Sequence, residues 1–219
     1  GYIWPLKLAV ETDVEEKLKT GEFLPIMEDF YTVQGEGHHT GSSAYFIRIG
    51  GCDVGCHWCD VKESWNAALH PLTDIREVIS RAASFPARTV VLTGGEPTGY
   101  QLSRITERLA EEGFSIHLET AGSYDLTGSF DWICLSPKKT VPPLPAIYPK
   151  ANELKVIVYN QNDLLWAEKQ AESVSSSCLL YLQPEWGKRD EIMPMIIDFV
   201  KEHPKWKVSL QSHKYMRIP

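Results

Sequence analysis

The sequence lacks long apolar runs and an excess of positive charge. No stretch of about 18 consecutive apolar residues occurs, so no transmembrane helix and no membrane association are expected. Lysine and arginine number 22 against 29 aspartate and glutamate, which gives a net charge of −7. This balance disfavours a protein that coats nucleic-acid phosphates, and no direct nucleic-acid partner is expected. A local basic pocket for a small anion is compatible with the same balance.

Neither an export signal nor a full disulfide framework is expected. The chain begins GYIWPLKLAV, which is too short and too weakly basic for a signal peptide, and no small-residue cleavage site follows. The five cysteines are an odd number and cannot all pair. We therefore expect a cytoplasmic protein with reduced thiols. Clustered cysteines in such a chain indicate metal binding rather than disulfides.

Short apolar segments alternate with amphipathic helices along most of the chain. Seven strands are expected, at residues 44–49, 88–93, 114–119, 132–135, 153–159, 178–183 and 206–211. Four helices are expected, at 73–84, 102–112, 163–173 and 191–202, with the last interrupted or kinked near Pro194. This alternation predicts an α/β fold with a parallel sheet. Four helices are too few for a full eight-unit barrel, so we expect an incomplete (β/α) TIM-like barrel.

The domain organisation is expected to be simple. Residues 1–25 contain an acidic helical stretch and then a turn at Gly21–Pro25, and they are interpreted as a peripheral N-terminal extension. Residues 26–219 are expected to form a single partial-barrel domain, a normal size for one hydrophobic core.

Polar residues gather where the expected strands end. In a barrel of parallel strands these ends meet on one rim, which is where chemistry collects. The segments concerned are Gly50-Gly51-Cys52, Thr93-Gly94-Gly95-Glu96-Pro97, Glu119-Thr120, Ser136-Pro137-Lys138, Gln183-Pro184, and Gln211 with His213.

Three cysteines stand close together, in the spacing Cys52-x3-Cys56-x2-Cys59. Thiolates are soft ligands that suit zinc or iron–sulfur clusters. Structural zinc needs a fourth ligand, and His57 or a distant histidine would have to supply it. A [4Fe–4S] cluster on three cysteines leaves one iron open to a substrate or cofactor. Cys134 and Cys178 lie inside apolar segments and are expected to be inert buried thiols.

The cysteine spacing, with Trp58 just before the last cysteine, resembles the radical S-adenosylmethionine (SAM) superfamily. The segment Thr93-Gly94-Gly95-Glu96-Pro97 is similar to the second motif of that superfamily, which contacts the methionine amino group of SAM. A pair of glycines lets main-chain atoms approach a ligand closely. The resemblance implies a partial barrel of the radical SAM type.

Further segments resemble one family of that superfamily, the 7-carboxy-7-deazaguanine synthases. They extend in order from about residue 26 to the C-terminal end. They comprise Phe30–Gly37, Thr40-Gly41, Phe46–Arg48, Gly51-Cys52, Leu118–Thr120, Leu135–Lys138, Glu153–Lys155, Leu182–Pro184 and Gln211–Tyr215.

This resemblance implies a reaction and its cofactors. The family converts 6-carboxy-5,6,7,8-tetrahydropterin to 7-carboxy-7-deazaguanine with loss of ammonia, on the route to queuosine and related 7-deazapurines. Reductive cleavage of SAM by the cluster generates a 5′-deoxyadenosyl radical, which abstracts a hydrogen from C6 of the pterin. A flavodoxin- or ferredoxin-type reductant and a homodimer are also implied.

The resemblance assigns roles to residues of this chain. Cys52, Cys56 and Cys59 hold the cluster. Residues implied to contact SAM are Trp58, Cys59, Asp60, Gly95, Glu119, Ser136, Pro137 and Lys138. Residues implied to contact the pterin are Val33, Gln34, Gly35, Glu36, Arg48, Thr93, Gln183, His213 and Pro219. Of these, Arg48 can meet the substrate carboxylate as a bidentate fork, which lysine could not do.

One position departs from the family pattern. Many members carry threonine or serine two residues after the third cysteine, where it helps to bind Mg²⁺, whereas this chain has Val61. Valine cannot ligate a hard cation that requires oxygen. The sequence therefore predicts weak Mg²⁺ dependence, with the metal absent, held by the substrate and waters alone, or replaced by the charge of Lys62.

Two other classes of protein are consistent with part of this sequence pattern. A glycyl-radical activating enzyme shares the cysteine spacing and the small size, but would not need the Gln34–Gly37 segment or Arg48. A zinc-stabilised binding module would use the cysteines without catalysis.

Overall fold

The computed structural model describes residues 13–50 and 72–219. The cysteine motif, Trp58, Asp60 and Val61 lie outside the described residues. Within those ranges, one sheet has the strand order β3-β1-β2-β4-β5-β6-β7-β8-β9. The strands are β1 (Phe23–Val33), β2 (Ser43–Ile49), β3 (Leu72–Asp74), β4 (Thr89–Gly94), β5 (Ser115–Thr120), β6 (Trp132–Leu135), β7 (Glu153–Val158), β8 (Leu179–Pro184) and β9 (Trp206–Val208).

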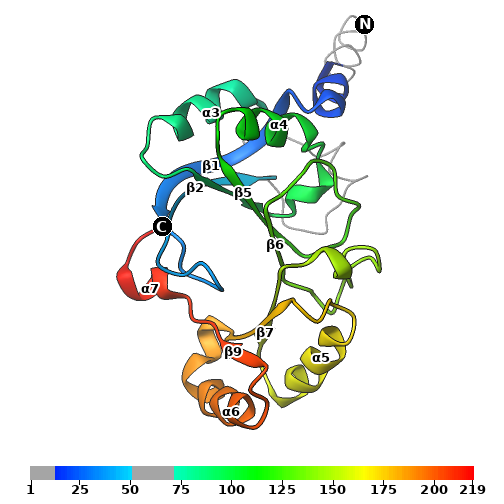
Figure 1. The fold of residues 1–219 in the computed structure, drawn as a ribbon, viewed down its shortest axis with the longest axis vertical. Coiled ribbons are helices and arrows are strands. Elements are labelled where there is room, and N and C mark those ends of the chain that lie inside the picture. The colour runs from blue at the N-terminus through cyan, green and yellow to red at the C-terminus, as the bar shows by residue number, and fades with distance from the viewer. Residues whose placement is uncertain (1–12, 51–71) are drawn as a thin grey trace, which may run out of the picture.

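The seven strands expected from the sequence form the parallel part of the sheet. They are β2 and β4 to β9, and each is parallel to the next. The sheet curves around a central space without closing, and its helices lie on the outside (Figure 1). These are α3 (Ile75–Ala83), α4 (Ser103–Glu111), α5 (Gln161–Ala171) and α6 (Arg189–Glu202), followed after β9 by the short α7 (Ser212–Met216). The incomplete (β/α) barrel is confirmed.

Two antiparallel strands were not expected. β1 pairs antiparallel with β2, and Phe23–Pro25 at its start pairs with β3. The turn expected at Gly21–Pro25 is therefore wrong beyond Glu22, and Leu24 is fully buried. The residues Glu28 and Asp29 interrupt the apolar pattern of β1, which obscured a strand whose aromatic and β-branched second half has high strand propensity.

The ends of the helices follow local capping rules. The N-cap of α3 is Asp74, the last residue of β3, whose carboxylate accepts from the Arg76 main chain. Its apolar residues Ile75, Val78, Ile79 and Ala82 are buried. Gly113 follows α4 in the left-handed region (φ 85°), as expected for a glycine after a helix. Helix α6 continues through Pro194 without interruption.

The two faces of the sheet differ in chemistry because side chains alternate along each strand. Outward-facing residues such as Val90, Leu92 and Leu118 pack with α3 and α4 in one apolar cluster. A second apolar cluster joins β7 and β8 to α5 and α6. Inward-facing residues are largely polar, and they include Arg48, Thr93, His117, Glu119, Glu153, Lys155, Tyr181 and Gln183.

The loop between β1 and β2, residues 34–42, extends into the central space (Figure 1). It bonds to the far side of the barrel, where Gly37 N donates to Ser209 Oγ (2.9 Å) and His38 N donates to Glu153 Oε2 (3.1 Å). The His38 ring stacks on Trp132. We call residues 34–42 the β1–β2 loop. It links the two halves of the open barrel.

Candidate functional site: two adjoining cavities inside the barrel

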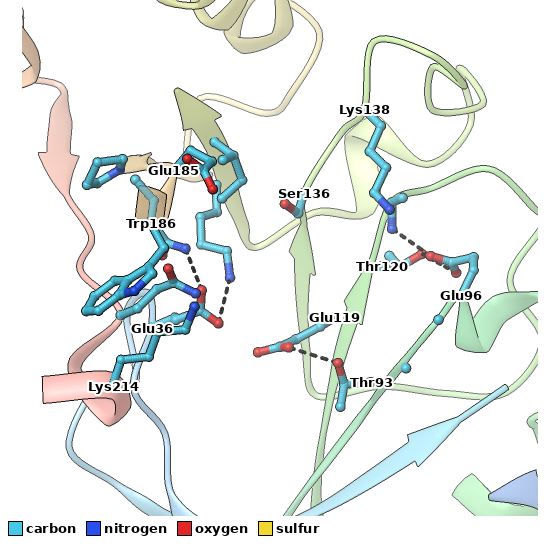
Figure 2. A pocket seen from close by; sticks show the side chains of 18 residues that line it. Glu36, Thr93, Glu96, Glu119, Thr120, Ser136, Lys138, Glu185, Trp186 and Lys214 are labelled. Atoms are coloured by element: carbon cyan, nitrogen blue, oxygen red, sulfur yellow. Dashed lines mark hydrogen bonds and ion pairs between the residues drawn. The ribbon is translucent and has the colours of Figure 1, made fainter. Parts of the chain in front are cut away.

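A cavity of about 360 Å³ opens at the C-terminal ends of the parallel strands. Glu36, Trp186 and Lys214 lie on one side of it, Thr120, Ser136 and Lys138 lie on the other, and Glu119 lies between (Figure 2). The remaining lining residues are Thr93, Gly94, Gly95, Glu96, Ala121, Lys155, Ile157, Gln183, Pro184, Glu185 and Gln211. We call this space the larger cavity.

A second cavity of about 210 Å³ adjoins it on the β1–β2 side. Its lining residues are Phe30, Val33, Gln34, Gly35, Glu36, Phe46, Arg48, Thr93, Glu119, His213 and Pro219. We call this space the smaller cavity. Glu36, Thr93 and Glu119 line both cavities, so the two spaces share a wall.

Glu119 is fixed in that shared wall by two hydrogen bonds. Gln34 Nε2 donates to its Oε1 (3.0 Å), and Thr93 Oγ1 donates to its Oε2 (3.1 Å). The three side chains come from the β1–β2 loop, β4 and β5. The carboxylate is thus oriented from both sides.

Glu36 is fixed from the opposite half of the barrel. Gln183 Nε2 donates to Glu36 Oε1 (2.5 Å), and Lys155 Nζ lies 3.7 Å from Glu36 Oε2. Burial disfavours ionisation of Glu36, but Lys155 and the bond from Gln183 outweigh it and hold the pKa of this carboxyl below its usual value. Ser209 Oγ donates to Gln183 Oε1 (2.8 Å) and so orients the amide.

Arg48 points into the smaller cavity from β2. Its Nε donates to Glu28 Oε1 (3.0 Å), and one terminal nitrogen donates to the Gly94 carbonyl (3.4 Å). These bonds hold the guanidinium at the cavity wall. A planar fork of donors in this position suits a carboxylate.

The Gly94–Pro97 turn is held by its own glutamate. Glu96 accepts from Thr120 Oγ1 (2.8 Å) and from the Ala121 main-chain nitrogen (2.7 Å), so its carboxylate ties the end of β4 to the end of β5. Gly94 is needed for packing here, since a Cβ at this position would lie 1.9 Å from the Ile49 carbonyl oxygen. Gly50, beside Tyr100, is the last described residue before the cysteine motif.

The C-terminal segment closes the smaller cavity. A Cβ on Gly35 would lie 2.1 Å from His213 Nδ1, so the loop and α7 are in direct contact there. Ser212 N also donates to the Gly35 carbonyl (2.9 Å). Arg217 adopts a left-handed conformation (φ 58°), and Ile218 N bonds back to the His213 carbonyl (3.1 Å). This turn brings Pro219 to the cavity wall.

Most of the residues singled out in the sequence line one or the other cavity, and Glu36, Thr93 and Glu119 line both. The smaller cavity is lined by Val33, Gln34, Gly35, Glu36, Arg48, Thr93, His213 and Pro219. The larger cavity is lined by Gly95, Glu119, Ser136, Lys138 and Gln183. Pro137 is buried but is not among the residues that line either cavity.

Sequence reasoning missed several lining residues. Lys155 and Trp186 line the larger cavity, and Phe30 and Phe46 line the smaller one. Trp186 carries the Arg189 guanidinium 4.0 Å and the Lys214 ammonium 4.8 Å from its ring centroid, which anchors α7 beside the cavity. The position of Lys155 within the segment Glu153–Lys155 was the available signal, because a lysine inside an apolar strand requires a partner.

The two remaining cysteines behave as expected. Cys134 and Cys178 are buried and free, and burial raises the pKa of both thiols. They stay protonated and unreactive at neutral pH. In the part of the chain that the structure describes, no helix has the length and apolar character to cross a membrane.

Comparisons with known proteins agree with this architecture. The Radical SAM superfamily matches residues 46–131. A 7-carboxy-7-deazaguanine synthase of Flavobacterium psychrophilum is 54% identical over 207 residues, covering 94% of this chain and 98% of that protein. One from Synechocystis sp. is 46% identical and covers 89% and 93%. The crystal structure of QueE from Escherichia coli superposes with a TM-score of 0.74 at 29% identity, covering 90% of this chain and 98% of that one. The chain therefore belongs to the 7-carboxy-7-deazaguanine synthase family of the radical SAM superfamily.

Proposed function

We propose that this protein converts 6-carboxy-5,6,7,8-tetrahydropterin to 7-carboxy-7-deazaguanine and ammonia, as a carbon–nitrogen lyase of queuosine biosynthesis. The product and ammonia together contain all atoms of the substrate, so no net oxidant is needed. The observation that carries the proposal is the pair of cavities that share Glu36, Thr93 and Glu119, since it supplies adjoining places for a cofactor and a small substrate.

Family membership implies a [4Fe–4S] cluster and SAM. Cys52, Cys56 and Cys59 are proposed to hold the cluster, and Trp58 and Asp60 to flank it. Together the two groups supply a carbon-centred radical when bound, and the protein contributes binding and orientation.

The donor set of the larger cavity suits SAM. Lys138 and the Ser136 hydroxyl offer a cation and a donor for a carboxylate, and the Gly94–Gly95 main chain offers carbonyl oxygens for an ammonium group. Glu119 offers a carboxylate for ribose hydroxyls. The volume of about 360 Å³ falls within the range of small-molecule sites.

The smaller cavity suits a flat carboxylated heterocycle. Arg48 is proposed to bind the substrate carboxylate, while Gln34 and Glu36 accept from the amino-pyrimidinone edge of the ring. Phe30 and Phe46, whose rings stack 5.7 Å apart, give this cavity an apolar side. Gln183 is proposed to act by orienting Glu36.

The wider assignments are proposals on the same basis. A flavodoxin- or ferredoxin-type protein is proposed to supply the electron, and the active unit is proposed to be a homodimer. The single catalytic domain is proposed to begin at Phe23, where β1 starts and Leu24 enters the core, rather than at residue 26, and the residues before it are proposed to form the peripheral extension.

Product analysis tests the function. Anaerobically reconstituted protein, incubated with SAM, dithionite and 6-carboxytetrahydropterin, should form 7-carboxy-7-deazaguanine and ammonia in equal amounts, detected by mass spectrometry. The same protein should be brown and lose visible absorbance on reduction. Cleavage of SAM without any deazaguanine product would contradict the substrate assignment, and a colourless protein with one bound zinc would contradict the whole reading.

A further inference from the structure

Lys155 occupies an unusual position for a lysine. It lies on β7, faces the interior of the barrel and is almost completely buried, with 7% of its side chain exposed. Burial disfavours its ammonium form, but the carboxylates of Glu36, Glu119 and Glu153 raise its pKa above the ordinary value. Lys155 is therefore a permanent cation beside the shared wall of the two cavities.

The carboxylates around Lys155 differ in how far they rely on its ammonium group as an interaction partner. Glu119 accepts from Gln34 and Thr93, and Glu153 accepts from the Trp132 indole and the His38 main chain. Glu36 is the carboxylate that forms an ion pair with Lys155, at 3.7 Å. Removing the ammonium should therefore affect Glu36 most.

Glu36 in turn helps to hold the β1–β2 loop. The loop is tied to β7, β8 and Ser209 by bonds from Glu36, Gly37 and His38. Glu36 makes two of these interactions, an ion pair with Lys155 and a hydrogen bond from Gln183. The same loop contributes Gln34, Gly35 and Glu36 to the smaller cavity.

We propose that Lys155 is a positioning residue for the smaller cavity, which pairs with Glu36 and so fixes the β1–β2 loop where it meets the pterin. This inference rests on the proposed function. Buried ion pairs add little net stability, but removing one partner leaves an uncompensated charge, so the surviving carboxylate would move toward water. Glu36 faces groups of three other elements, namely Lys155 on β7, Gln183 on β8, and His213 and Lys214 on α7.

Calorimetric titration of the anaerobic holoenzyme tests the proposal with two ligands, 6-carboxytetrahydropterin and SAM. The variants are Lys155→Met, Glu36→Gln and the double variant, with the exposed Lys150→Met as the control. We expect Lys155→Met to raise the Kd of the pterin about tenfold, a usual size for coupling between neighbouring sites, and to raise the Kd of SAM, whose proposed cavity Lys155 lines, by clearly less. In the Glu36→Gln background, Lys155→Met should change the Kd of the pterin by less than about twofold, because no carboxylate is left to position.

The outcomes separate the alternatives. An unchanged pterin Kd in Lys155→Met, an equal loss of affinity for both ligands, or the same loss in both backgrounds would each overturn the proposal. If Lys155→Met does not fold, the proposal is tested by comparing the pterin Kd of Glu36→Gln with that of the double variant. These two proteins differ only at position 155, and neither has an unpaired carboxylate at position 36. Agreement of their pterin Kd values supports the proposal, and a several-fold difference overturns it. Wild-type protein that fails to bind the pterin contradicts the proposed function itself, and with it this inference.

Discussion

Gln34 and Glu119 are 85 residues apart in the sequence, yet their side chains share a 3.0 Å hydrogen bond across the interior of the barrel. Gln34 belongs to the β1–β2 loop, and Glu119 to the end of β5. Glu119 also forms part of both cavities. This bond therefore connects the place proposed for the substrate with the place proposed for the cofactor.

Replacement of Glu119 by glutamine should weaken the binding of both ligands. The carboxylate accepts from Gln34 and Thr93 at once, whereas an amide must turn its NH₂ group toward one of these donors. We expect the Kd values of the pterin and of SAM each to rise about tenfold, the size of one lost bond to a charged group. Titration calorimetry measures both, with the exposed Glu111→Gln as the control. A change in one ligand alone would show that Glu119 does not serve both cavities.

Replacement of Arg48 by lysine should affect the pterin alone. Lysine keeps the positive charge but loses the planar fork that is proposed to bind the substrate carboxylate. We expect the pterin Kd to rise by about 10- to 100-fold, with SAM affinity and iron content unchanged. Arg76→Lys, on an exposed arginine that pairs with Asp74, is the matched control. Unaltered pterin affinity in Arg48→Lys would remove Arg48 from the substrate site.

Gly35→Ala should separate the β1–β2 loop from α7. The added methyl group would lie 2.1 Å from His213 Nδ1 and 2.6 Å from the His213 main-chain nitrogen, and the main chain cannot move aside cheaply. We expect the KM for the pterin to rise at least about tenfold, by the cost of overpacking. In Gly187→Ala the new methyl group meets only the mobile end of Glu185, at 3.2 Å, so this control should behave like wild type. A Gly35→Ala enzyme with normal KM would contradict the close contact.

The stability of the protein should fall in mildly acidic solution because of His117. Burial, with a further contribution from His39, lowers the pKa of His117 to about 4, although Asp131 opposes the change. The unfolded chain takes up a proton near the ordinary value of about 6.5, so this contribution to stability is complete above that pH and is lost as the pH falls toward 4. Because His117 is partly accessible to solvent, the expected decrease in the free energy of unfolding is only about 1 kcal/mol. Urea unfolding should therefore show that the free energy of unfolding falls less between pH 7.5 and pH 5 in His117→Gln than in wild type. Equal decreases would refute the assignment.

Removal of Mg²⁺ should have little effect on turnover. Val61 stands where many family members have a hydroxyl group, and an aliphatic side chain offers no ligand to a hard cation. After thorough chelation we expect added Mg²⁺ to change the rate by less than about twofold, whereas Val61→Thr should gain stimulation. Strong stimulation of the wild-type enzyme would contradict the prediction.

The parallel part of the barrel was predictable because each of its strands is an apolar segment with a turn or helix signal nearby. Strands β1 and β3 were not, since β1 carries Glu28 and Asp29 in its middle and β3 has only three residues. Phe23–Pro25 at the start of β1 pairs with β3, which lies about 50 residues later in the sequence, and local pattern does not reveal such a pairing. For this reason the prediction of a turn at Gly21–Pro25 was wrong beyond Glu22.

The site was predictable to the extent that its residues belong to recognisable motifs. The smaller cavity contains eight of the nine residues singled out for the substrate, and Gln183 lies in the larger cavity instead. Lys155 and Trp186 were missed, because their importance depends on which face of a strand or which side of a loop meets the cavity. Such facts come from register and curvature rather than from residue type.

The smaller cavity combines Val33 and Gln34 with His213 and Pro219, so its walls come from nearly opposite ends of the chain. During synthesis on a ribosome the first β-hairpin emerges long before the segment against which its loop rests. Contacts of such large sequence separation form late in folding. The capacity to retain a pterin should therefore be among the last properties that a newly made or refolding molecule acquires, after its secondary structure and most of its apolar core.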